Sequence, residues 1–347
     1  MAQPFQRKLS LVVTRNMEAE HANPGGSVHG GTILDMITQA GCIESTKHCN
    51  RSSDSDPENP LLGVIARVEH TEFLQPVFIG ELCEVYAQVA YTSEHSIEVA
   101  VEVWAENVFT DTKRLTNRAT LWFVAVPANS SPLLKCSKVP ALQMSEEERK
   151  LGEERYLFQK KHRHGKVGPI PPAHDGLLPD PHMAPAGSPL CSLTSLRHLV
   201  LPHDCHSQGL MQGGPLMKLM DSCAGIVASR HCKTSVVTAS LEAIDFLGPI
   251  YKGELVTIKG RLVFASAKSM EIRITVEAEN PKPGSLRVTN EAYFTFVSLD
   301  RATGKTLPVP PLVPQTDSER ELFELRKLRY QERKAKRQEG AAVKQKL

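Results

Sequence analysis

The 347-residue sequence predicts an α+β protein made of two copies of one domain, each an antiparallel sheet wrapped around a central apolar helix. Two observations support this prediction. An apolar helix that begins at a glycine pair occurs twice, and each copy is followed by stretches of alternating, β-branched residues. The matches between the halves extend beyond the helix into these stretches, and repeats of this length indicate a duplicated domain and not a solenoid.

Composition excludes several classes of protein. The chain is 41% apolar and 23% charged, which is typical of a globular protein, and its net charge of +2 gives no electrostatic case for nucleic acid. No run approaches the ~18 apolar residues that a membrane span needs. The eight cysteines are scattered and form no CxxC pair, so we expect reduced thiols, as in a cytosolic protein, and no metal site.

One carboxylate interrupts the second apolar helix. The helix starts at Gly213-Gly214, where the backbone can turn tightly. Pro215 suits its first turn, because an N–H there would have no hydrogen-bond partner within the helix and proline lacks one. Residues on both faces are apolar or small, which predicts a buried helix. Asp221 lies in its middle. Because an unpaired buried carboxylate is costly, Asp221 must have a partner, face water or perform a task.

The first half of the chain carries the same pattern. Residues 23–49 match residues 206–232 at an offset of 183 (206 − 23), and residues 63–82 match 236–255 at an offset of 173 (236 − 63). The ten-residue difference falls in the loop at 50–60, which is longer in the first copy. The two halves therefore descend from one duplicated unit that differs mainly in this connection.

Short turns between the strand-like stretches favour antiparallel pairing. Alternation is clear in SIEVAVEVWAE (96–106), so one face of the sheet is expected to face water while the other packs on the helix. The elements expected in the first copy are a strand at 8–13, a helix from about Gly31 to Thr46, and strands at 62–73, 82–91, 96–106 and 115–126.

Two segments do not fit the repeated pattern. Residues 127–190 contain a charged helix at 144–162 and a stretch rich in proline and glycine, so we expect an interdomain linker. The last segment begins with proline-rich sequence and ends in a basic tail, expected to be a solvated helix or a disordered arm. The predicted division is a first domain at 8–126, the linker at 127–190, a second domain at 191–300 and the terminal segment at 301–347.

An apolar helix wrapped by a long antiparallel sheet, duplicated in one chain, is typical of a double hotdog. The ordered motifs ANPGGSVHGGTILDMI, GPIYKGELVTIKGRL and LMDSCAGIVASRHCKTSVVTAS resemble the cytosolic acyl-CoA thioester hydrolases across nearly the whole chain. The resemblance implies hydrolysis of fatty acyl-CoA, such as long-chain palmitoyl-CoA, to free fatty acid and CoA without a metal or redox cofactor. It also implies a cytosolic homo-oligomer, a trimer of two-domain units.

Thioester hydrolysis needs an activated water or nucleophile and donors for the oxyanion. A helix N-terminus offers free N–H groups, and Gly30 and Gly31 would let a thioester carbonyl approach them closely. The resemblance assigns catalysis to Asn23 near one helix start and to Asp221 in the other domain. Asn23 would orient the carbonyl or the water. Asp221 would be general base or nucleophile, and the sequence leaves both open.

The duplication provides an internal control. By the repeat, Asn23 corresponds to His206 and Asp221 corresponds to Thr38, which cannot act as a carboxylate base. Gln212 replaces His29 at the helix start that would serve this second site. The sequence therefore predicts one working composite site and one degenerate site.

The resemblance also implies that CoA lies along strand and turn backbones of either copy, and the sequence does not decide which copy serves the working site. Lys268 could meet a CoA phosphate as a point charge. The candidate CoA contacts are Ala239, Ser240, Leu241, Lys268, Ser269 and Met270, with Ala66, Arg67, Val68, His95, Ser96 and Ile97 as their copies.

Three other polar residues receive structural interpretations. The spacing of Asp35 from His29 predicts exposure at the surface, and His48 and His231 are expected to pack at helix ends. Two alternatives to a thioesterase remain open. One is a non-catalytic acyl-CoA-binding paralogue, and the other is a hydratase that uses His29 with an acid.

Overall fold

The computed structural model describes residues 10–51, 57–129, 136–162, 184–282, 284–300 and 303–344. Parts of the predicted linker and of the loop at 50–60 lie outside the described residues, as do the first two residues of the strand predicted at 8–13. None of the helices described is long and apolar enough to cross a membrane.

The first half of the chain contains one central helix and six strands. The segment predicted as one strand at 62–73 forms two strands. Each of them pairs with a different strand of the second half. The elements are β1 (Ser10–Asn16), α1 (Gly30–Asn50), β2 (Leu61–Val68), β3 (Thr71–Phe73), β4 (Leu82–Thr92), β5 (Ser96–Asn107) and β6 (Thr112–Pro127).

The second half repeats these elements in the same order, which confirms the predicted α+β fold of two halves, each with antiparallel strands around one central helix. One further helix follows each half, α2 (Glu146–His162) and α4 (Asp317–Lys344). The repeated elements are β7 (Thr194–Leu199), α3 (Gly213–Cys232), β8 (Ser235–Leu241), β9 (Ile244–Phe246), β10 (Leu255–Ala265), β11 (Ser269–Asn280) and β12 (Ser285–Leu299).

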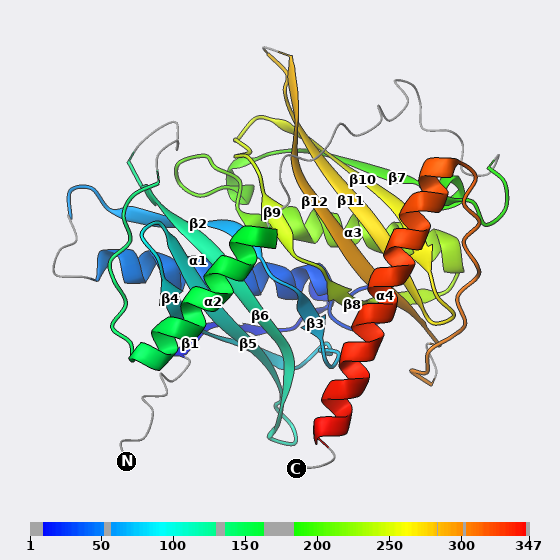
Figure 1. Ribbon diagram of the computed structural model, residues 1–347, viewed down its shortest axis with the longest axis horizontal. Coiled ribbons are helices and arrows are strands. Elements are labelled where there is room, and N and C mark those ends of the chain that lie inside the picture. The colour runs from blue at the N-terminus through cyan, green and yellow to red at the C-terminus, as the bar shows by residue number, and fades with distance from the viewer. Residues whose placement is uncertain are drawn as a thin grey trace.

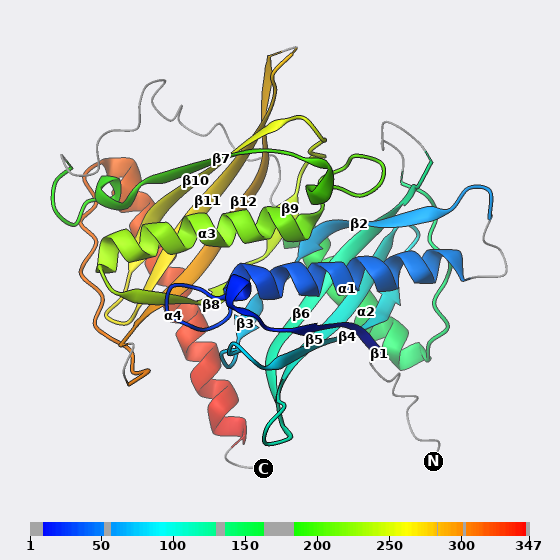
Figure 2. The ribbon, with the colours of Figure 1, turned by 180° about the vertical axis from the view of Figure 1, so that it is seen from behind.

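The two half-sheets join into one continuous antiparallel sheet. Its order is β1-β4-β5-β6-β2-β9-β12-β11-β10-β7, and β3 and β8 pair with each other beside this path. The joints are reciprocal, since β2 of the first half pairs with β9 and β3 pairs with β8. This pseudo-twofold arrangement brings α1 and α3 together on one face of the sheet (Figure 2).

The core lies between these central helices and the sheet. Buried side chains of α1 such as Leu34 and Ile37 belong to the same apolar cluster as Val99 and Phe123 of the facing strands. Such burial contributes roughly 1.5–3 kcal/mol for each large apolar side chain. The apolar residues that predicted buried helices therefore pack against the face of the sheet that α1 and α3 cover.

The outer face of the sheet is only partly wetted, which corrects the sequence prediction. Helices α2 and α4 cover it on the side opposite α1 and α3 (Figure 1). Under α2, Trp122 of β6 is buried, and its ring centroid lies 5.9 Å from that of Tyr156. Under α4, the Phe264 ring lies 5.2 Å from Phe323. The prediction of a solvated tail is therefore wrong for the part of α4 that packs here.

An ion pair with a buried glutamate fixes each outer helix at the same place in its half. Arg155 of α2 makes a bidentate contact with Glu98 at 2.6 and 2.7 Å. Arg326 of α4 pairs with Glu271, the residue that corresponds to Glu98 at the offset of 173, and its guanidinium lies 3.8 Å from the Tyr293 ring centroid. The outer helix therefore belongs to the duplicated unit.

We expect Arg326→Ala to lower the free energy of unfolding by about 3 kcal/mol, because it leaves buried Glu271 with a weakened set of partners. Arg320→Ala is the matched control in the same helix. The contacts of Arg320 with Asp317 and with the Gln315 carbonyl are exposed, so its removal should cost less than ~1 kcal/mol. Urea denaturation followed by circular dichroism measures both. Equal losses for the two variants would contradict the structural role of the buried pair.

Candidate active site

The carboxylate of Asp221 lies where the two halves meet. Its Oδ2 accepts a hydrogen bond from the Gly31 N–H at 2.7 Å, and its Oδ1 accepts one from the Thr238 hydroxyl at 2.8 Å. The Nδ1 of His29 is 3.1 Å from the same Oδ2. The side chain is 2% exposed. The second half thus supplies a buried acid to the N-terminus of α1 in the first half.

Glycine is required at this helix start by close packing. A Cβ on Gly31 would come within 2.8 Å of the Lys218 Cα, and a Cβ on Gly30 would come within 2.7 Å of the Thr238 Oγ1. Any side chain here would push α1 away from α3 and β8. The glycine pair therefore allows the approach that brings Asp221 to the helix N-terminus.

The two glycine N–H groups differ in availability. The Gly31 N–H, predicted as an oxyanion donor, already donates to Asp221. The Gly30 N–H is the first of the helix and has no acceptor among the residues that the structure describes. Gly30 also lines the cavity beside Asp221. The helix start can thus hold the carboxylate with one N–H and still present another to a ligand.

Burial raises the pKa of Asp221 above its ordinary value, because desolvation disfavours the charged form. The nearby His29 ring, the Thr238 hydroxyl and the Gly31 N–H each act in the opposite direction. The helix N-terminus also favours a negative charge at this place. A carboxylate held between these opposing effects can accept a proton closer to neutral pH than an exposed aspartate.

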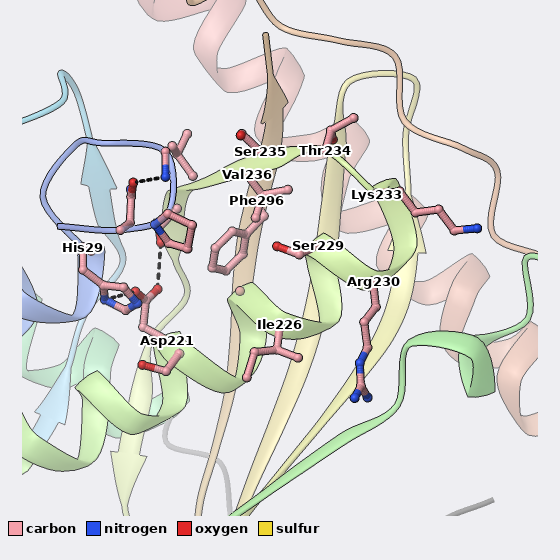
Figure 3. Close-up of a pocket in the computed structure, with 18 residues that line it drawn as sticks. His29, Asp221, Ile226, Ser229, Arg230, Lys233, Thr234, Ser235, Val236 and Phe296 are labelled. Atoms are coloured by element: carbon pink, nitrogen blue, oxygen red, sulfur yellow. Dashed lines mark hydrogen bonds and ion pairs between the residues drawn. The ribbon is translucent and has the colours of Figure 1, made fainter. Parts of the chain in front are cut away.

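Asn23 lies in a tight loop that borders the same cavity. Its Oδ1 accepts a hydrogen bond from the Gly25 N–H at 2.8 Å, and its Nδ2 donates to the Ser27 Oγ at 2.9 Å. An amide nitrogen carries two hydrogens, so one remains for a ligand. Asn23, His29 and Asp221 all line a cavity of about 630 Å³ (Figure 3). The structure therefore brings the two predicted catalytic residues to one cavity.

The pseudo-symmetric site lacks these polar groups. The Thr38 hydroxyl donates to the Leu34 carbonyl of its own helix at 2.6 Å and does not reach across to α3. Ile65 occupies the place that Thr238 has beside Asp221, and its Cγ2 would lie 2.7 Å from a Cβ on Gly213. His206 is half-buried, and desolvation lowers its pKa. This geometry supports the prediction of a degenerate second site.

The predicted CoA contacts are not among the residues that line the cavity. Lys268 is exposed at the turn before β11, and His95 is exposed at the turn before β5. The buried guanidinium of Arg67 is bound to Asp245 and Glu69, at 2.7 Å each. The others lie in β2 (Ala66, Val68), β8 (Ala239, Ser240, Leu241), the start of β5 (Ser96, Ile97) and the start of β11 (Ser269, Met270).

The prediction that Asp35 lies exposed is wrong. Asp35 is half-buried between the central helices, and a Cβ on Gly214 would come within 2.1 Å of its Oδ1. Burial raises its pKa, with Arg15 and Lys218 acting in the opposite direction. The helix crossing covers it, which spacing along one helix cannot reveal.

The two repeated histidines pack at helix ends, as expected. The ring nitrogens of His48 and His231 each lie 2.8 Å from a proline carbonyl, those of Pro140 and Pro310 respectively. These carbonyls belong to the segments that lead from the sheet to the outer helices. The histidines therefore fasten the same segment in both halves.

Thr238 is the site residue that the sequence analysis did not identify. Its hydroxyl is the only side-chain hydroxyl among the described residues that donates to Asp221. The repeat contains a signal for it, because the equivalent position in the first copy is Ile65. A polar residue in one copy therefore corresponds to an apolar residue in the other. The carboxylate and its threonine partner differ together between the copies.

Comparison with known proteins agrees with this architecture. The Thioesterase superfamily model matches residues 25–108 and 208–285, one stretch in each half. The putative oleoyl thioesterase structure from Lactobacillus plantarum has the same fold, with a TM-score of 0.53 at 11% identity over 84% of this chain and 98% of that one. Fold and matched regions together define a double hotdog thioesterase.

Closer relatives span nearly the whole chain. The mouse cytosolic acyl coenzyme A thioester hydrolase is 46% identical over 96% of this chain and 86% of its own length. The human protein of the same name is 45% identical over 95% of this chain and 84% of its own. The chain belongs to the cytosolic acyl coenzyme A thioester hydrolase family and is an acyl-CoA thioesterase.

We expect Thr238→Val to move the acidic limb of the pH profile of kcat/KM to higher pH by about one unit. The hydroxyl stabilises the ionised carboxylate, so its removal raises the pKa of Asp221 further. Thr234→Val is the control, because Thr234 borders the same cavity but bonds with Ser298. Unchanged limbs in both variants would show that Asp221 does not govern the profile.

Proposed function

We propose that the protein hydrolyses long-chain fatty acyl-CoA, such as palmitoyl-CoA, to free fatty acid and CoA at a single composite site. The observation that supports this most is the buried Asp221 carboxylate, bound to the helix start of the other half beside a cavity. Asn23 and the Gly30 N–H border the same cavity. Together they supply an acid–base group and two donors to one place.

In the proposed reaction, Asp221 acts as general base on a water molecule. Its carboxylate accepts a proton from the water, and the resulting hydroxide attacks the thioester carbonyl carbon. The Gly30 N–H and the Asn23 amide stabilise the oxyanion of the tetrahedral intermediate. The carbon–sulfur bond then breaks, the carbonyl re-forms, and the departing thiolate takes the proton from Asp221, which gives CoA and regenerates the carboxylate.

Base catalysis accounts for the environment of Asp221 better than nucleophilic attack does. Burial raises its pKa, which suits a group that must accept a proton near neutral pH. Hydrogen bonds from Gly31 and Thr238 hold its two oxygens in a fixed orientation. The nucleophilic route would form an acyl-aspartyl anhydride. When water hydrolyses this anhydride at the aspartyl carbonyl, a single turnover in ¹⁸O-labelled water places the label in Asp221, whereas the base route places it in the fatty acid.

The proposal also covers the cellular location of the protein and its oligomeric state. The relatives are named cytosolic, and we propose the same location. The continuous sheet ends at β1 on one side and β7 on the other, which leaves two edges for association with further units. We keep the trimer of two-domain units, implied by the resemblance, as the proposed assembly.

We expect Asp221→Asn to reduce kcat for palmitoyl-CoA by at least about a thousandfold, because the amide cannot accept the proton from water. Thr38→Val at the equivalent position is the matched control and should retain near-normal turnover, since its hydroxyl bonds only to its own helix. Thiol release measured with a chromogenic disulfide tests both. Full activity in Asp221→Asn would refute the composite site, and binding of acyl-CoA without thiol release by the wild type would refute hydrolysis.

A further inference from the structure

The cavity continues from Asp221 along one face of α3 towards its C-terminal end. Asp221, Gly225 and Ser229 line it at successive turns of α3, and Lys233, which follows the helix, lines its end. The strand β8 lines the opposite side. The helix rises by about 16 Å between Asp221 and its last residue, Cys232. The cavity is therefore a groove between α3 and β8, long enough for an extended long-chain acyl group.

The middle of this groove is apolar. Gly225, Ile226, Val236 and Phe296 line it, and the Phe296 ring lies between Asp221 and Ser229 (Figure 3). The side chain of Lys233 extends away from the Asp221 end in the same view. An apolar wall that starts at the reacting carboxylate suits a hydrocarbon chain better than the amides and phosphates of CoA.

The equivalent space in the first half is closed by hydrogen bonds between helix and strand. The Cys42 Sγ donates to the Gly63 carbonyl at 3.3 Å, and the Gly63 N–H donates to the Thr46 Oγ1 at 3.0 Å. The Asn50 amide bonds to both the N–H and the carbonyl of Leu61. Together these bonds fasten α1 directly to β2 along its C-terminal half.

The second half has other residues at the same three positions. Cys42, Thr46 and Asn50 correspond at the offset of 183 to Gly225, Ser229 and Lys233, which make no side-chain bond to β8 among the described residues. The helix and the strand are therefore joined by side-chain hydrogen bonds in the first half, whereas a groove lies between them in the second half. The half with the groove is the one that carries Asp221.

We propose that the fatty acyl chain of the substrate lies in this groove between α3 and β8, and that Gly225 determines how long a chain the enzyme accepts. This inference rests on the proposed function, because it places the acyl chain relative to the carboxylate that activates water. It adds the direction of the chain and the residue that sets its limit.

Gly225 is suited to this role because the position tolerates a side chain without a clash. A Cβ there would meet only the Phe296 ring, at 3.7 and 3.9 Å, which is ordinary van der Waals contact. A longer side chain would cover Phe296 and fill the groove beyond the carboxylate. Because glycine is a poor helix former, its replacement should not reduce the stability of α3.

The test compares kcat/KM for butyryl-, octanoyl- and palmitoyl-CoA in the full chain, wild type against Gly225→Ala and Gly225→Leu. Each displaced methylene should cost about fourfold in kcat/KM. We expect Gly225→Leu to lose on the order of a hundredfold with palmitoyl-CoA and to remain within about twofold with butyryl-CoA. Gly225→Ala should shorten the preferred chain more weakly. Cys42→Ala, at the equivalent position of the first half, should leave the chain-length profile unchanged.

Three outcomes would overturn the inference. The first is an unchanged chain-length profile in Gly225→Leu, and the second is an equal loss with all three substrates, which would indicate that the groove holds the CoA portion. The third is a shifted profile in Cys42→Ala. Thermal unfolding of each variant excludes misfolding as the cause of a loss, with Gly225→Ala as the mildest change. Absence of thiol release by the wild type with every substrate would instead refute the proposed function.

Discussion

The site depends on the burial of one carboxylate at the junction of the two halves. Asp221 would be costly in this position without partners, and the partners come from both copies, Gly31 from the start of α1 and Thr238 from β8. Their convergence requires that α1 and α3 cross closely, which glycine at the helix start permits. The continuous sheet holds both helices on one face, so the site cannot form in either half alone.

Duplication allows the two symmetric positions to carry different residues. In the first half, threonine and isoleucine, Thr38 and Ile65, stand where the second half has Asp221 and Thr238. The same half fastens its helix to β2 through Cys42. In the first half, a carboxylate beside the hydrogen-bonded contact of α1 with β2 would be buried with few partners. The absence of an acid and the absence of a groove in this half are therefore consistent with each other. The two copies therefore differ both in the acid and in the contact between helix and strand.

Sequence periodicity predicted the helices, the strands and the duplication because these follow from local patterns of apolar residues. Asp221 was identifiable as the single acid in an apolar helix, whereas its assignment with Asn23 required the family resemblance. Thr238 was not identified, because its role depends on a contact across the helix–strand interface. Arg326 lies in a helix so highly charged that it suggested solvation, and only the fold shows the buried glutamate beneath it.

The same physical effect links assembly of the halves to the chemistry of the site. Association removes water from Asp221, which raises its pKa, while the N-terminus of α1 limits the rise by donating a hydrogen bond. An isolated second half would expose this carboxylate and return its pKa towards that of an ordinary aspartate. The interface that joins the two halves therefore also sets the basicity of Asp221, the base of the proposed reaction, and duplication in one chain keeps the two halves together.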